Sequence, residues 1–199
     1  MPEQIQENER VAIFIDNNFL YLGLKATIPE EYRKVDYLRL CRKMAHPGRL
    51  TRIRLYVSPP PPFVDTSGYE RWRRKMEALP FVDIVEGKIK KRVRVVRLAG
   101  SRKLEKAEYY EQKGVDVKLA IDMIALARIQ AFDVAILVSG DSDFVGLAEL
   151  VKQFNLHILN AHCPASREHS YYYSKELERI CDRPPIILDR HFLSDCVSS

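Results

Sequence analysis

Four aspartates are the residues of this chain whose type and spacing could do chemistry. They are Asp16, Asp116, Asp141 and Asp143. Carboxylates at close range repel one another, and burial makes their charged forms costlier, so such a group needs a cation nearby. No lysine or arginine lies within two residues of Asp16, Asp141 or Asp143. We therefore expect Mg²⁺ or Mn²⁺ as the cofactor, because these ions prefer hard oxygen ligands.

A divalent ion held by carboxylates can activate a water molecule for attack on a phosphodiester bond. Polar side chains close to the aspartates would then support the site by orienting a water or a phosphate oxygen. These are Asn17, Asn18, Ser139, Ser142 and Asp122. Asp122 follows Asp116 by six positions, which is roughly 240° around a helix, so these two side chains point apart. We assign Asp122 a supporting or structural role.

Each aspartate also has a structural alternative. Asp143 or Ser142 could cap the helix that follows, and Asp116 could cap its own helix. Asp16 could simply accept hydrogen bonds from backbone amides in a turn. The functional interpretation therefore requires that the four aspartates lie close together in the fold. It also requires that some of their carboxylate oxygens are not hydrogen-bonded to the local backbone.

The elements that must position these residues alternate along the chain. Short β-branched or aliphatic runs predict strands over 11–15, 52–58, 81–87, 133–139, 156–159 and 186–188. Apolar spacing between them predicts helices over 19–25, 35–45, 69–79, 115–130, 144–154 and 174–182. Repeated strand–helix units predict an α/β fold, a three-layer α/β/α sandwich with a mainly parallel central sheet. The tail 191–199 is short, and we expect it to be mobile.

The expected fold places the aspartates at one edge of the sheet. Asp16 directly follows the strand VAIFI, and Asp141 and Asp143 directly follow the strand DVAILV. In open α/β sheets, ligands bind beyond the carboxyl ends of the strands. If these two strands are neighbours, three carboxylates converge there, and Asp116 can join them from the start of its helix.

Positive charge is concentrated in one segment. The chain carries a net charge of +5, and the stretch 86–106 contains nine basic and two acidic residues, so it carries +7 and the remainder −2. Such a footprint favours a polyanion partner, most simply a nucleic acid. The candidate phosphate-binding residues are Lys88, Lys90, Lys91, Arg92, Arg94, Arg97, Arg102, Lys103 and, beyond the stretch, Lys113. The alternative is a solvated strand or hairpin whose lysines protect a sheet edge from pairing.

Length and composition restrict the class of protein. A chain of 199 residues with 46% hydrophobic and 30% charged residues fits a globular domain and excludes a disulfide-stapled miniprotein. No apolar run reaches the roughly 18 residues of a membrane span, and the polar start MPEQIQENER is not typical of a secretory signal. We therefore expect a cytoplasmic protein with no membrane partner.

Cysteine and histidine do not predict a zinc site. The four cysteines are scattered without a CxxC pair, so reduced thiols are expected. His162, Cys163 and His169 lie close together in the sequence but lack the paired spacing typical of metal ligands.

Three segments together resemble the motif blocks of the NYN domain. They are FIDNN (14–18), KGVDVKLAIDM (113–123) and VSGDSDF (138–144), and SKELERICD (174–182) is similar to the family's late helix. The family includes LabA-like proteins and belongs to the PIN-like nuclease superfamily. The resemblance implies a single PIN-like domain over 9–190, with 1–8 and 191–199 as terminal extensions. It further implies metal-dependent RNA cleavage, with catalytic and metal-binding roles for the four aspartates.

One position departs from the family pattern. The family often has an asparagine three residues after the first aspartate, and here that position is Phe19, with Asn18 beside it.

The same segment disfavours two other enzyme classes. A phosphatase with Asp16 as nucleophile would usually need a second aspartate at position 18, which is Asn18 here. A dinucleotide-binding oxidoreductase would need a glycine-rich loop after the first strand, and this loop has none.

The predicted function is a metal-dependent ribonuclease that hydrolyses RNA phosphodiester bonds, with single-stranded or structured RNA as the partner. The alternative is a non-catalytic RNA- or protein-binding module of the same fold. The sequence leaves a homo-oligomer open.

Overall fold

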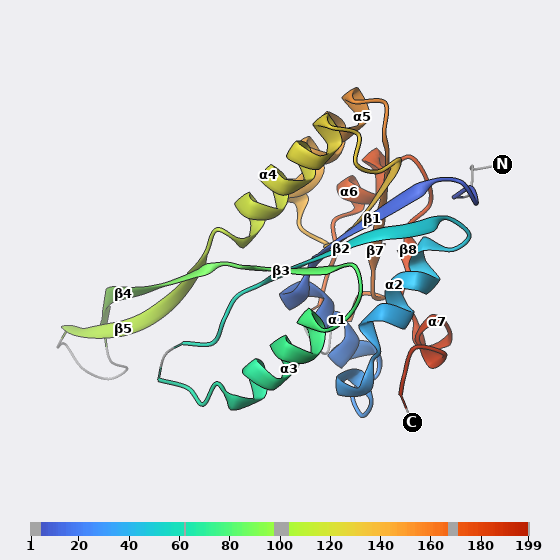
Figure 1. Ribbon diagram of the computed structural model, residues 1–199. Coiled ribbons are helices and arrows are strands. Elements are labelled where there is room, and N and C mark those ends of the chain that lie inside the picture. Colours follow the sequence, from blue (N-terminus) through green and yellow to red (C-terminus); the bar gives the residue numbers. More distant parts are fainter. Residues whose placement is uncertain (1–4, 62, 98–103, 167–170, 199) are drawn as a thin grey trace.

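Six parallel strands form the central sheet of the protein, in the order β3-β2-β1-β6-β7-β8 (Figure 1). The computed structural model describes residues 5–61, 63–97, 104–166 and 171–198. The strands are β1 (Arg10–Asp16), β2 (Arg49–Val57), β3 (Val82–Glu86), β6 (Val134–Val138), β7 (His157–His162) and β8 (Ile186–Ile187). The predicted α/β class with a mainly parallel sheet is confirmed.

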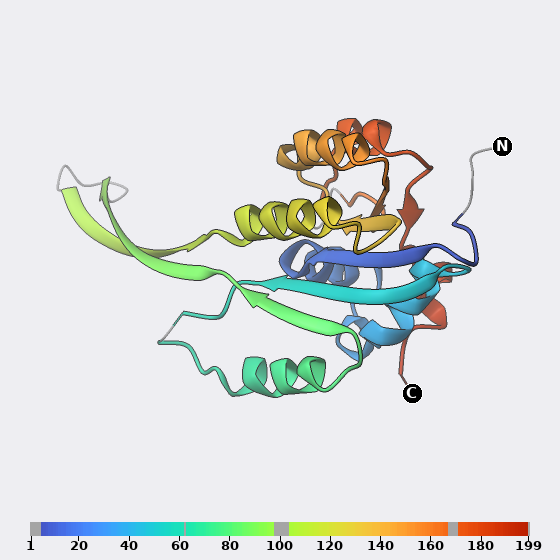
Figure 2. The same cartoon turned by 45° about the horizontal axis from the view of Figure 1, so that its top comes forward.

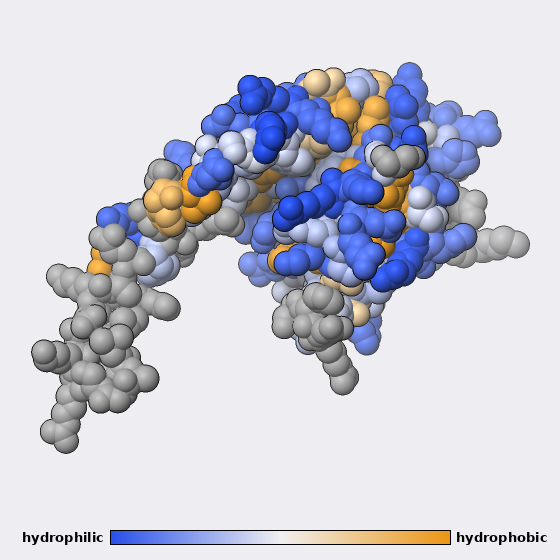
Figure 3. All heavy atoms as spheres, turned by 90° about the horizontal axis from the view of Figure 1, so that it is seen from below, coloured by the Kyte–Doolittle hydropathy of each residue, from blue (hydrophilic) through white to orange (hydrophobic). Residues whose placement is uncertain are grey.

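Helices cover both faces of this sheet (Figure 2). One face carries α1 (Asn17–Thr27), α2 (Tyr37–Ala45), α3 (Ser67–Glu77) and α7 (Arg190–Ser194). The other carries α4 (Val115–Arg128), α5 (Val145–Gln153) and α6 (Lys175–Ile180). Two short 3₁₀ helices, η1 (Tyr32–Lys34) and η2 (Ser142–Phe144), precede α2 and α5. The lower face of the molecule, which carries α3, is mainly hydrophilic (Figure 3).

The two central strands are buried on both sides, which explains their continuous apolar runs. In β1, Ile13 and Ile15 pack into the core under α1 and α2, whereas Ala12 and Phe14 pack into the core under α4 and α5. All five residues of β6 are buried. Because β1 pairs directly with β6, their carboxyl ends lie side by side at one edge of the sheet.

A two-stranded antiparallel arm, β4 (Lys88–Arg97) with β5 (Leu104–Lys113), projects away from the sheet (Figure 1). Its base is fixed at Gly87, whose N–H donates to the carbonyl of Val57 at 2.8 Å. A Cβ at Gly87 would lie 2.6 Å from Cγ2 of Val115, so only glycine fits this close approach. The arm therefore leaves the body directly beside the start of α4.

Two sequence expectations need correction. The helix after β1 is longer than the predicted 19–25, because Asp16 caps it and it begins at Asn17. The tail was expected to be mobile, but it contains most of α7, with Leu193 and Cys196 buried against the body. Within the described ranges, no helix is long and apolar enough to cross a membrane.

Candidate active site at an acidic rim

Asp16 and Asp141 lie at the carboxyl ends of the two adjacent central strands, on what we call the acidic rim. Asp16 is the last residue of β1, and its Oδ1 accepts hydrogen bonds from the backbone N–H groups of Asn18 (3.1 Å) and Phe19 (3.2 Å). Asp141 follows β6, and its Oδ1 accepts from the N–H of Asp143 at 2.9 Å. Asp16 therefore bonds its local backbone, as the structural alternative predicted, and in doing so it caps α1. The cap after β6 is Asp141, at the start of η2, rather than the predicted Asp143 or Ser142.

Each of these caps uses only one of the two oxygens of its carboxylate. Among the described residues, Oδ2 of Asp16 and Oδ2 of Asp141 accept no hydrogen bond. Each side chain can therefore hold its local backbone with one oxygen and present the other to a ligand.

Asp116 and Asp143 complete the acidic rim without acting as caps. Asp116 lies in the first turn of α4, where the N-cap residue is Gly114 and no side chain bonds the helix terminus. Asp143 lies in η2, and both side chains are exposed. Neither carboxylate has a hydrogen-bond or ion-pair partner within the described part of the chain.

The carboxylates of the rim influence one another electrostatically. Burial, together with the smaller effect of the negative charges of Asp116 and Asp141, raises the pKa of Asp16 to about 6, against the opposing effect of its backbone hydrogen bonds. Burial also raises the pKa of Asp116, with contributions from Asp141 and Asp143. The rim is thus a place where negative charge is disfavoured and a cation would be favoured.

The acidic rim offers oxygen donors for a metal ion, but they are not densely clustered. Over the ranges that the structure describes, no group of three or more His, Cys, Asp or Glu side chains is arranged closely enough to hold one. The donor set itself suits Mg²⁺ or Mn²⁺, because Mg²⁺ usually keeps several waters and binds only one or two carboxylates directly. The unbonded oxygens of Asp16 and Asp141 meet that smaller requirement.

The predicted supporting residues divide into two groups. Ser139 is buried, and its hydroxyl accepts a hydrogen bond from the N–H of Asp141 at 3.3 Å, whereas Asn18 and Ser142 are exposed near the rim. Asn17 is directed elsewhere, because its Oδ1 accepts from the hydroxyl of Tyr37 on α2 at 2.8 Å.

Asp122 belongs to a different network. Its Oδ2 accepts from the hydroxyl of Tyr56 at 3.0 Å and lies 3.9 Å from Nη1 of Arg54. Both partners are on β2, so this carboxylate fastens α4 to the sheet.

Sequence reasoning missed Asn160, which supports the rim from β7. Its side-chain amide donates to the carbonyls of Leu137 (3.0 Å) and Ser139 (2.7 Å), and the residue is fully buried. Its Oδ1 is buried without a hydrogen-bond partner. A lone amide within the apolar strand HILNAH was the available signal, because buried polar side chains are normally there to make hydrogen bonds.

His162 has no ring nitrogen left for a metal ion, because both nitrogens have partners within the protein. Nε2 lies 2.7 Å from Oε1 of Glu178, and Nδ1 lies 2.8 Å from the carbonyl of Cys163. The ring of Tyr173 stacks on His162 with centroids 3.7 Å apart. His169 lies outside the described residues. The histidine therefore holds the segment around Tyr173 against β7.

The predicted phosphate-binding residues lie mainly on the arm. Lys88, Lys90, Lys91 and Arg92 on β4 and Lys113 on β5 are exposed. In the antiparallel register Lys88 is opposite Lys113 and Arg92 is opposite Tyr109, and alternate residues of a strand share a face. Arg94 and Arg97 also lie on β4, but their side chains are not described, and Arg102 and Lys103 lie outside the described residues.

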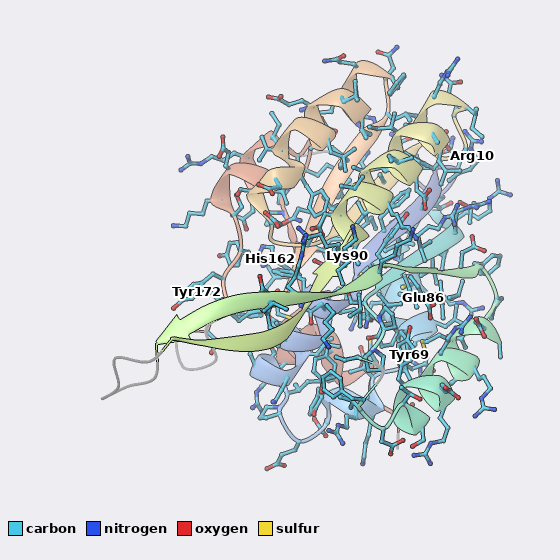
Figure 4. The ribbon with its side chains drawn as sticks, turned by 90° about the vertical axis from the view of Figure 1, so that its left-hand side faces the viewer. Arg10, Tyr69, Glu86, Lys90, His162 and Tyr172 are labelled. Carbon is cyan, nitrogen blue, oxygen red and sulfur yellow. The ribbon has the colours of Figure 1, made fainter. Side chains whose placement is uncertain are left out.

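The exposed basic residues of the arm begin next to the acidic rim. Lys113, at the end of β5, precedes Asp116 by only three residues, and Figure 4 shows Lys90 further along the arm. A polyanion bound along the arm would therefore reach the carboxylates at its base.

The comparisons with known proteins agree with this architecture. A family model described as NYN domain matches residues 10–187. The crystal structure of a protein of unknown function from Vibrio parahaemolyticus is similar, with a TM-score of 0.61 and 21% sequence identity, covering 96% of this chain and 99% of that chain. At that identity the likeness shows the fold alone. No curated protein matches the sequence.

Proposed function

Because the chain belongs to the NYN domain family, within the PIN-like superfamily, we propose that it is a metal-dependent ribonuclease. The observation that carries the proposal is the pair of unbonded carboxylate oxygens, on Asp16 and Asp141, at the ends of adjacent parallel strands. This is where an open α/β sheet binds its ligand. The family suggests a nuclease-like fold related to RNA, and the acidic rim supplies the chemistry.

The residues have distinct roles in this mechanism. Asp16 and Asp141 would hold the ion through their unbonded carboxylate oxygens, and Asp116 and Asp143 would orient water at the rim. When bound, Mg²⁺ or Mn²⁺ supplies an activated water and neutralises charge on the phosphodiester. Lys113 and the basic residues of the arm, which begin beside the rim, bind phosphates that flank the bond to be cleaved.

A second candidate is a non-catalytic RNA- or protein-binding module of the same fold. It is favoured by one observation: no group of three or more metal-binding side chains is preformed among the described residues. In such a protein the arm would bind RNA, and the acidic rim would not catalyse its cleavage.

Cleavage of labelled RNA separates the two candidates. We expect Mn²⁺-dependent cleavage that a chelator stops and that Asp141→Asn reduces at least a hundredfold. The matched control is Asp195→Asn, which removes the same charge from an exposed position beside α7. RNA that stays intact but binds with a strong dependence on salt would select the binding module.

A further inference from the structure

A cleft of about 440 Å³ lies between α3, the loop after β2 and the end of β3. Its walls combine flat apolar surfaces with charged groups. They include Pro59, Pro60, Tyr69, Glu70, Arg74 and Glu77. Its volume lies within the usual range for small-molecule and cofactor sites in proteins.

The cleft includes the end of β3, which lies at the same edge of the sheet as the acidic rim. Glu86, which also lines it, is the last residue of β3, and in the sheet β3 is two strands away from β1. At the usual spacing between strands this separation is about 10 Å. The cleft also adjoins the base of the arm, because Gly87 follows Glu86 directly, and Figure 4 shows Tyr69 near Glu86.

Several polar groups of the cleft already have partners. The hydroxyl of Tyr69 donates to Oε1 of Glu86 at 2.8 Å. The guanidinium of Arg73 contacts Glu86 at 3.4 Å and Glu77 at 3.0 Å. These contacts hold the ring of Tyr69 and one arginine in place.

Other groups are left for a ligand. Within the described part of the chain, the guanidinium of Arg74 has no hydrogen-bond or ion-pair partner. Glu70 uses Oε1 to accept from the hydroxyl of Thr66, and Glu77 uses Oε1 for Arg73, so each keeps Oε2. The cleft thus offers an unpaired guanidinium, carboxylate oxygens, an aromatic ring and two prolines.

This chemistry fits a nucleobase better than a phosphate. Three glutamates and two arginines line the cleft, so its net charge is negative and disfavours a phosphate group. An unpaired base can stack on an aromatic side chain and be recognised through hydrogen bonds along its edge. Guanine presents acceptors to an arginine through O6 and N7. Its ring N–H and amino group are donors that a carboxylate can accept.

We propose that this cleft binds an unpaired guanine of the RNA, one or two nucleotides from the bond that is cleaved. The proposal rests on the proposed function, because the acidic rim defines where the RNA strand passes. Arg74 contacts O6 and N7, Glu70 or Glu77 accepts from the ring N–H and amino group, and the base packs on Tyr69 and the prolines.

The chain has a natural reporter for this site. Trp72 is its single tryptophan, and its ring stacks on Tyr69 with centroids 5.9 Å apart and an interplanar angle of 28°. A base that packs on Tyr69 changes the surroundings of this pair. Occupation of the cleft should therefore change the fluorescence of Trp72.

The test compares a short oligouridine with the same oligomer carrying one central guanosine, both titrated into the full chain in excess chelator. We expect the guanosine oligomer to bind about tenfold more tightly and to change Trp72 fluorescence, since a good bidentate contact to a base discriminates by this order. Arg74→Gln should abolish the preference. Arg71→Gln, which removes the same charge from an exposed α3 position outside the cleft, should retain it.

Equal binding of the two oligomers, no binding of either, or a preference that survives Arg74→Gln would overturn the proposal. The chelator separates this result from the proposed function, because binding is measured without cleavage. A protein that cleaves RNA without any preference for guanosine keeps its proposed activity and loses this site. A protein that prefers guanosine but does not cleave RNA keeps this site and loses the proposed activity.

Discussion

The side-chain amide of Asn160 donates to the carbonyl of Ser139 at 2.7 Å, joining β7 to the segment that carries the acidic rim. The same amide reaches the carbonyl of Leu137 at 3.0 Å. Asn160 thereby fixes the backbone two residues before Asp141. A buried amide that ties two strand ends together contributes to stability and to the position of the carboxylate.

Replacing Asn160 should lower the free energy of unfolding and loosen the backbone that positions Asp141. Asn160→Ala leaves two buried carbonyls without their amide partner, at a cost of about 2–4 kcal/mol in the free energy of unfolding. Urea denaturation measures the effect. The control, Gln153→Ala at an exposed position of α5, should stay within about 0.5 kcal/mol of the parent. A loss no larger than that of the control would mean that the two hydrogen bonds contribute little.

The raised pKa of Asp16 makes stability depend on pH. Because burial holds the folded-state pKa at about 6, above the ordinary 3.8, the protonated carboxyl is favoured in the folded protein. The associated stability is fully present below about pH 4 and is lost as the pH rises through 6, by roughly 2–3 kcal/mol in the absence of divalent ions.

Asp16→Asn tests this dependence, because asparagine also caps helices but carries no charge. Urea denaturation in chelator, repeated from pH 4 to pH 8, should show a smaller decline for the variant than for the parent. Asp195→Asn should leave the decline in place, since Lys43 lowers the pKa of that exposed carboxylate and so acts in the opposite direction. An identical decline in the parent and in Asp16→Asn would show that another group is responsible.

Divalent ions should stabilise the folded protein. An ion that binds only the native state raises the unfolding temperature with concentration, and the acidic rim is a site that the unfolded chain lacks. We expect Mn²⁺ to raise the melting temperature of the parent at pH 8 but not that of Asp16→Asn or Asp141→Asn. Asp122→Asn, which alters the network with Tyr56, should retain the response to Mn²⁺ even if its starting stability is lower. A response that persists in Asp141→Asn places the ion elsewhere.

The arm should contribute RNA affinity through charge. Lys88→Glu with Lys90→Glu reverses two exposed positions on the same face of β4, so RNA binding should weaken at least tenfold. The slope of log affinity against log salt should become less negative by at least about 1.4 for single-stranded RNA. Filter binding at several salt concentrations measures both. Lys34→Glu, exposed in η1, is the control and should change the slope by less than half as much.

Continuous apolar runs made the central sheet predictable. Residues 11–15 of β1 and all of β6 are buried on both faces, and strands buried in this way read as continuous apolar runs. Because Asp16 and Asp141 come directly after these two apolar runs, the sequence also predicted that they lie at the carboxyl edge of the sheet. That β1 and β6 are neighbours could not be derived from composition, because pairing in a parallel sheet depends on contacts far apart in sequence.

The remaining parts depend on contacts that no local pattern encodes. The resemblance indicated a family and four aspartates, but not that Asp16 and Asp141 would each bond the backbone with one oxygen only. Asn160 is a single letter in an apolar strand, and its two acceptors lie on a different strand. The cleft beside α3 is formed jointly by that helix, the loop after β2 and the end of β3, which are brought together only in the folded chain.

The most direct test of the central claim is a crystal structure of the protein with Mn²⁺ or Mg²⁺ bound. The account predicts an ion at the acidic rim, about 2.1 Å from Oδ2 of Asp16 and from Oδ2 of Asp141 for Mg²⁺, with waters completing its shell. An ion bound at other side chains, or none at the rim at saturating concentration, would contradict it.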